Sequence, residues 1–178
     1  MTEAKKIELV FLWHMHQPDY RDHATGEFRR PWTYLHALKD YTDMAAHLER
    51  HPQVRAVVNF VPVLLEQIED YVAQFDAGDF RDPLLRLLAR ESLDCLEAEE
   101  RALLLSVCIP GNHARMVAPY PRFERLCRLF QPIAGQGDVA AAYLSGAYFA
   151  DLLVWYHLVW TGETERRRQP LLAELMSK

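Results

Sequence analysis

Trp13-His14-Met15-His16-Gln17-Pro18-Asp19-Tyr20 decides how the fold begins, because it follows an apolar run and cannot continue it. The run Ile7 to Trp13 is short and rich in apolar and aromatic residues, which is typical of a buried β-strand. Pro18 has no backbone N–H and cannot extend a central strand, so the chain leaves the sheet here. Side chains alternate along a strand, so His14 and His16 point the same way. The stretch therefore predicts two imidazoles on one wall of a pocket.

The segment that follows predicts a strand-helix-strand unit. Pro31 favours the first turn of a helix reaching about His51, with apolar residues every three or four positions. Val54 to Val61 is β-branched and apolar, which is typical of a second buried strand. Such a unit implies two parallel strands joined by a right-handed crossover. The expected apolar stripe of the helix is Trp32, Leu35, Leu38, Tyr41, Met44, Ala45 and Leu48.

Helices dominate the rest of the chain. Pro62 begins a helix through about Phe75, with Leu64, Leu65, Ile68, Tyr71 and Val72 as its expected apolar face. Gly146 to Trp160 is apolar nearly all round, as expected of a helix buried on several sides. Turns containing Pro and Gly separate the other expected helices, with no further clear strand between them. These helices span Pro83 to Arg90, Asp94 to Ser106, Arg122 to Phe130 and Asp138 to Leu144.

Length and composition indicate one soluble globular domain. The chain has 178 residues, of which 50% are hydrophobic, and a formal net charge of -5. A chain of this size can bury roughly 70% of the surface that its unfolded form exposes. The mild, dispersed charge favours neither a nucleic-acid groove nor binding to an anionic membrane surface.

Cysteine usage and the N-terminus indicate a cytoplasmic protein. Cys95, Cys108 and Cys127 are odd in number and widely spaced, which fits neither a disulfide framework nor a zinc ribbon. We expect reduced, mostly buried thiols. Met1 to Lys6 is polar and precedes too short an apolar stretch for a signal peptide, and no stretch approaches eighteen apolar residues.

A series of short motifs occurs in order along nearly the whole chain. The first is His14-Met15-His16-Gln17-Pro18, which contains a His-Gln-Pro tripeptide. The others are Arg30-Pro31-Trp32, Leu35-His36, Lys39-Asp40-Tyr41, Asn59-Phe60-Val61-Pro62, Leu64-Leu65-Glu66-Gln67, Pro119-Tyr120-Pro121-Arg122-Phe123, Asp151-Leu152, Val154-Trp155-Tyr156 and Leu158-Val159-Trp160. Together they resemble the N-terminal part of glycoside hydrolase family 57, an α-amylase and 4-α-glucanotransferase family, in which the His-Gln-Pro tripeptide marks the end of the first barrel strand.

The resemblance implies an α/β fold, the N-terminal portion of an incomplete (β/α)7 barrel with a largely helical insertion. Residues 1–178 would form a single partial domain. Residues 1–80 would be the start of the barrel, and residues 81–178 a helical region of the same catalytic domain. Two strands alone leave open edges, so the chain reads as a fragment of a larger protein or as one piece of an assembly.

The resemblance also implies a retaining glycoside hydrolase or glucanotransferase that uses no metal or cofactor. Retaining chemistry needs two carboxyl groups roughly 5 Å apart, one as nucleophile and one as acid/base. The family supplies this Glu and Asp from later regions, so we expect both beyond Lys178 and no catalytic residue in this chain. The chain alone is then expected to be inactive.

The expected role of the matched residues is to bind an α-glucan or maltooligosaccharide. His14 and His16 would form hydrogen bonds to sugar hydroxyls and to developing charge, with Gln17 fixing the orientation. Aromatic side chains can stack on sugar rings, and the second strand supplies a polar side chain at its end. The complete expected substrate-binding set is His14, His16, Gln17, Tyr20, Trp32, Asn59 and Glu66. A glucan is the expected partner, together with self-association or completion of the sheet by a missing C-terminal part.

Other interpretations of the histidines remain open. His14 and His16 could be core residues bonded to backbone carbonyls, or could bind a metal ion completed by His113 or Asp19, as in polysaccharide deacetylases. A non-catalytic carbohydrate-binding or assembly module is a further alternative. His157, inside the apolar helix, is expected to be a hydrogen-bonded core residue rather than a ligand.

Overall fold

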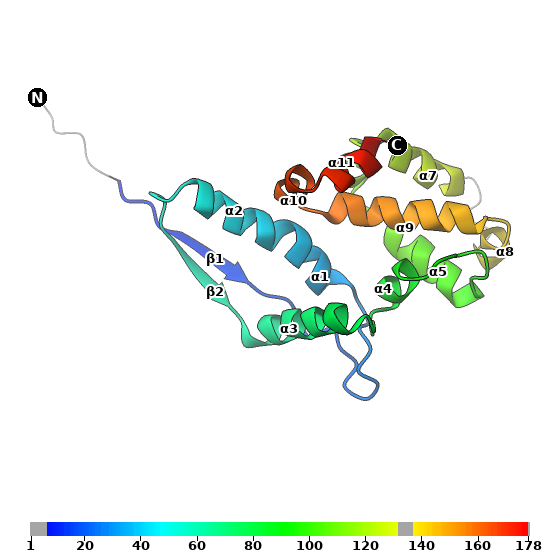
Figure 1. Ribbon diagram of the computed structural model, residues 1–178, viewed down its shortest axis with the longest axis horizontal. Helices are drawn as coiled ribbons and strands as arrows, with labels where there is room; N and C mark the ends of the chain where they lie inside the picture. The colour runs from blue at the N-terminus through cyan, green and yellow to red at the C-terminus, as the bar shows by residue number, and fades with distance from the viewer. Residues whose placement is uncertain (1–6, 132–136, 178) are drawn as a thin grey trace, which may run out of the picture.

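The computed structural model describes residues 7–131 and 137–177 of the chain (Figure 1). The polar stretch Met1 to Lys6 lies outside these ranges. Strands β1, Phe11–Met15, and β2, Ala56–Phe60, pair in parallel with His14 opposite Asn59. The expected parallel strand-helix-strand unit is therefore confirmed. The first strand begins later than expected and includes both His14 and Met15.

The two strands are exposed, so the prediction that they are buried is wrong for this chain. Leu12 is 65% exposed and Val57, its partner in the register, is 55% exposed, whereas Met15 at the end of β1 is buried. Phe11 is also exposed, although neighbouring residues of a strand face opposite sides of the sheet. The reason is that the sheet has two strands in the described ranges, and a parallel sheet is buried only when further strands and helices cover it.

The helix between the strands contains a π-helical turn. It runs as α1, Trp32–His36, then η1, Ala37–Tyr41, then α2, Thr42–Arg50. The hydroxyl of Thr42 donates a 2.7 Å hydrogen bond to the carbonyl of Ala37 within this turn. A π turn inserts one extra residue, which breaks the strict helical period. The expected apolar stripe is therefore only partly correct, since Leu35 is buried whereas Leu38 and Ala45 are exposed.

The buried face of helix α3, Pro62–Ala77, agrees only in part with the expected one, since Leu64 and Tyr71 are buried as expected. Its buried residues recur at helical spacing and include two glutamines: Leu64, Gln67, Tyr71 and Gln74. Leu65 and Val72, expected to be buried, are 42% and 55% exposed. The two glutamine amides turn inward because they bond to the chain on either side. Gln67 donates to the carbonyl of Pro18, and Gln74 accepts from the backbone N–H of Arg81.

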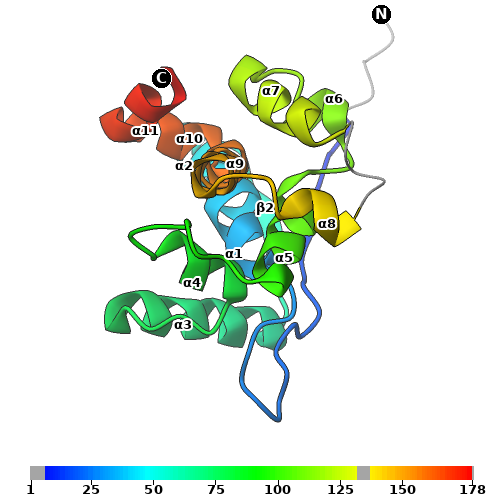
Figure 2. The same ribbon diagram turned by 90° about the vertical axis from the view of Figure 1, so that its right-hand side faces the viewer.

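The remaining helices surround α9, Gly146–Trp160, as Figure 2 shows by viewing it nearly along its axis. Helix α9 contacts α1, α4, α5, α7 and α11. Nine of its residues are buried, which confirms the prediction of a helix enclosed on several sides. No helix in the described ranges is both long and apolar enough to cross a membrane. The other helices are α4, Pro83–Leu88; α5, Ala98–Cys108; α6, His113–Met116; α7, Pro121–Phe130; α8, Gly137–Ala141; α10, Glu163–Arg168; and α11, Pro170–Ser177.

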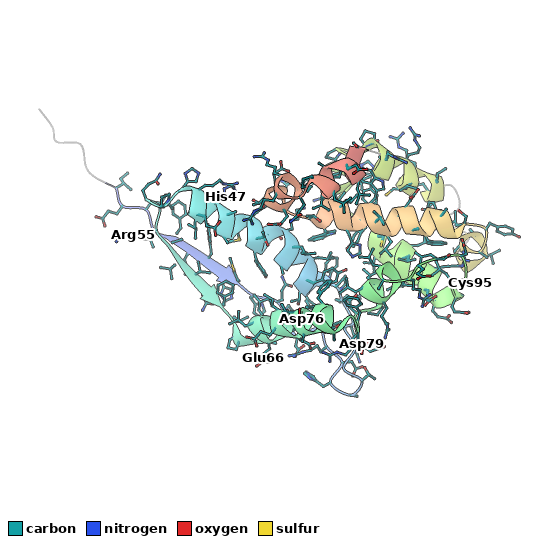
Figure 3. The ribbon with its side chains drawn as sticks, in the orientation of Figure 1. His47, Arg55, Glu66, Asp76, Asp79 and Cys95 are labelled. Carbon is teal, nitrogen blue, oxygen red and sulfur yellow. The ribbon has the colours of Figure 1, made fainter. Side chains whose placement is uncertain are left out.

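The three cysteines are free thiols, as expected. Cys108 and Cys127 are buried, and burial raises the pKa of both thiols, to about 11 for Cys127. Cys95 is exposed (Figure 3).

His157 is a core residue with both ring nitrogens bonded, as expected. Its Nδ1 lies 2.8 Å from the carbonyl of Leu153 and its Nε2 lies 2.8 Å from the hydroxyl of Tyr34. A carbonyl can only accept, so Nδ1 carries the proton and Nε2 accepts from Tyr34. Burial lowers the pKa of His157, which keeps the ring neutral at pH 7.

We predict that this neutral histidine makes the fold sensitive to mild acid. The unfolded chain takes up a proton near pH 6.5, whereas the lowered pKa delays uptake in the folded state, so stability falls as the pH drops. Urea unfolding at about pH 7.5 and 5.5 should show a smaller loss of unfolding free energy in His157→Gln than in the wild type. The control is His47→Gln, at an exposed histidine of α2 (Figure 3). Equal pH dependence in the wild type and His157→Gln would contradict this account.

Candidate functional site

Two parallel imidazoles stand at the end of β1. The rings of His14 and His16 are stacked with centroids 5.8 Å apart and planes 8° apart. Nδ1 of His14 lies 2.6 Å from Oδ1 of Asn59, its partner across the sheet. Among the described residues, no hydrogen bond involves Nε2 of His14 or either ring nitrogen of His16. Both side chains are exposed, and Asn59 bonds to Nδ1 of His14. Nε2 of His14 and both ring nitrogen atoms of His16 are therefore available to a ligand.

Gln17 is fixed by two tyrosines. The hydroxyl of Tyr20 donates to Oε1 of Gln17 at 2.9 Å, and Nε2 of Gln17 donates to the hydroxyl of Tyr41 at 3.3 Å. Tyr41 is the last residue of the π-helical turn. The loop after β1 is therefore tied to the helix that follows it.

The buried side-chain amide of Gln67, on α3, anchors the loop after β1. Its Oε1 accepts from the backbone N–H of Tyr20 at 3.0 Å and from the hydroxyl of Thr33 at 3.2 Å. Its Nε2 donates to the carbonyls of Pro18 and Val63, at 2.9 and 3.0 Å. Gln67 is fully buried, and both polar atoms of its amide are bonded.

Three carboxylates converge on Arg21. Its guanidinium makes two bonds of 2.9 Å to Asp19 and lies 3.3 Å from Glu66 and 3.9 Å from Asp70. The Arg21 hydrogen bond lowers the pKa of Asp19 to about 2, so this carboxyl is ionised at neutral pH. Glu66 is largely exposed at the side of α3 (Figure 3) and contacts Arg21 rather than either histidine.

The pKa of Asp82 is shifted in the opposite direction to that of Asp19. Burial raises the pKa of its carboxyl, which a proton donor would need. Its two oxygens, however, accept from the hydroxyl of Tyr71 at 2.8 Å and from the backbone N–H groups of Leu84 and Leu85. Asp82 is therefore the buried N-cap of α4 rather than an accessible acid.

The remaining expected residues line separate cavities. A cavity of about 570 Å³ is lined by Tyr20 and by charged residues of the loop that runs to Arg30. A second, of about 290 Å³, is lined by Trp32 and Trp160, whose ring centroids are 5.8 Å apart. The structure thus brings together His14, His16 and Asn59, joins Gln17 to Tyr20, and leaves Trp32 and Glu66 apart from the histidines.

Sequence reasoning missed Tyr41 and Gln67. Glu66 was expected to contact substrate from the family resemblance, whereas it is the adjacent Gln67 that supports the loop. The available signal was the spacing of Leu64, Gln67 and Tyr71, which places the glutamine on the buried face of α3.

The structure gives no support to the metal-binding alternative. In the described parts of the chain, no three His, Cys, Asp or Glu side chains come together as a metal site would require. His113 lies 3.7 Å from Glu124, and Asp19 is bound to Arg21.

Comparison with the sequence profiles of protein families matches residues 10–134 to the family described as Glycosyl hydrolase family 57. The chain belongs to glycosyl hydrolase family 57. The match begins just before β1 and includes the histidine pair, the Gln67 anchor and α3 to α7. Searches of curated proteins and of solved structures found no match. Family 57 membership supports a glycoside hydrolase function and confirms the resemblance seen in the motifs.

We predict that the loop of this family 57 chain depends on Gln67. Gln67→Met keeps the length of the side chain but removes the partner of the buried Thr33 hydroxyl, and also of the N–H of Tyr20 and the carbonyl of Pro18. The expected loss is about 3 kcal/mol of unfolding free energy, measured by urea denaturation. The control is the neighbouring Glu66→Gln, which removes one exposed ion pair and should change stability by less than about 0.5 kcal/mol. Similar losses in both variants would contradict the anchoring role.

Proposed function

We propose that this chain supplies one wall of the α-glucan site of a family 57 glycoside hydrolase or glucanotransferase, without the catalytic carboxylate pair. The proposal takes the chain as the first part of a (β/α)7 barrel, with His14, His16, Gln17, Tyr20, Trp32, Asn59 and Glu66 as the glucan-binding residues. It rests on family membership and on one observation above the others. This observation is the stacked, exposed histidine pair at the carboxyl end of β1.

The geometry of the pair suits sugar hydroxyls. Asn59 holds His14 through Nδ1, which favours presentation of Nε2 to a ligand. The two imidazole rings lie in nearly parallel planes with centroids 5.8 Å apart, so both can form hydrogen bonds to one bound sugar. Pre-positioned groups of this kind bind a ligand without first having to become ordered.

The pKa shifts of Asp19, in the loop after β1, and of Asp82, the N-cap of α4, favour a binding role over a catalytic one. A glycosidase acid/base needs a raised pKa, and Arg21 has the opposite effect on Asp19. Asp82 has a raised pKa, but its oxygens are occupied inside the fold. We therefore propose that the nucleophile and the acid/base come from elsewhere in the complete enzyme.

The open sheet favours a second candidate, an assembly module completed by another polypeptide segment. Leu12, Val57 and Phe60 expose apolar side chains, and within residues 7–131 and 137–177 each of the two strands has a neighbour on one edge only. Unpaired strand edges bind further strands. In this candidate the stacked pair His14 and His16, the histidine wall, binds glucan without catalysing its cleavage or transfer.

We predict that the purified chain binds maltotriose without cleaving it. Isothermal titration should show saturable binding, weakened about tenfold in His14→Ala because a hydrogen bond to a sugar hydroxyl is lost. His47→Ala, at an exposed histidine of α2, should bind as the wild type does. Release of glucose or maltose by the chain would refute the absence of the carboxylate pair. Equal binding by the wild type and His14→Ala would refute the histidine wall.

We also predict that the exposed sheet drives self-association. Light scattering coupled to size exclusion should give a mass above that of the 20.7 kDa monomer. Leu12→Lys places a charge on the open strand and should shift the protein toward the monomer. A wild-type chain that is monomeric at all concentrations would count against completion of the sheet by a second copy.

A further inference from the structure

Helix α3 carries a second row of apolar side chains, apart from its buried face. The row consists of Leu65, Ile68, Val72 and Phe75, at alternating spacings of three and four residues. Side chains at this spacing lie along one side of a helix, as they do where the helices of a coiled coil meet. Leu65, Val72 and Phe75 are 42%, 55% and 52% exposed, and Ile68 is partly exposed. We call this row the outer stripe.

The contacts of α3 with the rest of the fold use its other face. Gln67 bonds to the hydroxyl of Thr33 on α1, and the ring of Tyr71 meets that of Tyr34 edge-on, with centroids 5.2 Å apart. These contacts hold α3 in place and leave the outer stripe accessible. Exposed apolar side chains that gather in one place, bordered by polar residues, mark interaction sites.

Carboxylates border the outer stripe. Glu69 lies four residues after Leu65, and Asp76 lies four residues after Val72. Residues four apart are neighbours on a helix surface, so the two carboxylates form an acidic edge along the stripe. Asp79 follows just beyond the end of α3 (Figure 3).

These three carboxylates differ from the other two of α3, which have basic partners. Glu66 lies 3.3 Å from Arg21, and Asp70 bonds to Arg81. Within residues 7–131 and 137–177, the side chains of the three carboxylates beside the stripe form no hydrogen bond or ion pair. The segment from Pro62 to Phe80 contains no Lys, Arg or His. The acidic edge is therefore free to attract basic groups.

An apolar row with an acidic edge is complementary to a helix that carries an apolar row with a basic edge. Such a helix can pack its apolar residues between those of the stripe. Opposite charges along the two edges select the partner and fix its orientation. We propose that the outer stripe binds an amphipathic helix of a partner protein, with Lys or Arg beside its apolar residues. This surface is separate from the histidine wall and does not depend on glucan binding.

The same charges disfavour a second copy of α3 as the occupant. Antiparallel pairing of two α3 helices brings identical edges together, so Glu69 and Asp76 of one copy would face those of the other. Like charges placed together across an interface weaken binding. The self-association predicted for the open sheet involves the strands rather than this stripe.

Fluorescence anisotropy with a synthetic helix tests the proposal. The probe is a labelled peptide of about three heptads, with Leu in its apolar row and Lys beside it, and the matched peptide has Glu in place of Lys. The wild-type chain should bind the Lys peptide at least about tenfold more tightly than the Glu peptide. Val72→Gln removes an exposed apolar side chain from the stripe. It should weaken binding about tenfold and leave the melting temperature unchanged.

Two double variants separate the acidic edge from the overall charge of the chain. Glu69→Gln with Asp76→Asn should weaken binding of the Lys peptide about three- to tenfold. The control is Glu91→Gln with Glu99→Gln, which removes the same charge at exposed positions outside α3 and should bind as the wild type does. Equal weakening in both would show attraction to the net charge of -5 alone and would overturn the proposal.

Three further results would also overturn it. Equal binding of the two peptides by the wild type would remove the role of the acidic edge. Equal binding of the Lys peptide by the wild type and Val72→Gln would remove the role of the outer stripe. If the wild type binds neither peptide and Val72→Gln has a lower mass in light scattering, the stripe joins copies of this chain instead.

Discussion

The side-chain amide of Gln67 holds together three segments that are distant in the sequence: the loop after β1, the start of α1 and the first turn of α3. It has bonds to Tyr20, Thr33, Pro18 and Val63. Because the amide is fully buried, losing a partner would leave polar groups without water to replace it. An amide offers a donor and an acceptor together, which neither a carboxylate nor an apolar side chain does. The position of the loop after the two histidines depends on this one group.

The molecule combines a closely packed end with an open one (Figure 1). At the packed end, α9 is enclosed by helices and supplies much of the core. At the open end, β1 and β2 pair with each other and expose apolar side chains such as Leu12 and Val57. The histidine pair lies where β1 ends, so the open sheet and the proposed glucan wall belong to the same part of the molecule.

Local sequence patterns predicted much of this fold. Pro31, Pro62 and the apolar run up to Trp160 correctly located helices, because proline position and helical periodicity act over a few residues. The pairing of His14 with Asn59 also agreed with a parallel unit. Strand burial was mispredicted, because it depends on neighbouring strands and helices that a local pattern does not contain.

The candidate site was harder to predict than the fold. Sequence reasoning identified the histidines from their spacing, which strand geometry converts directly into a shared direction. The resemblance to family 57 suggested Glu66, and the polar residue Gln67 within the apolar stripe of α3 was overlooked.

The π-helical turn η1 sets the phase between the two halves of the helix that carries the candidate site. Each residue of an α-helix turns the following ones by about 100°, so one extra residue rotates everything after Ala37 relative to Trp32. Tyr41 faces Gln17, and Trp32 faces Trp160, only in this phase. Loss of a single residue from the turn would rotate Tyr41 away from Gln17 relative to Trp32. The relative positions of the contacts made by Trp32 and Tyr41 thus depend on the number of residues in the turn, and not on the identity of one side chain.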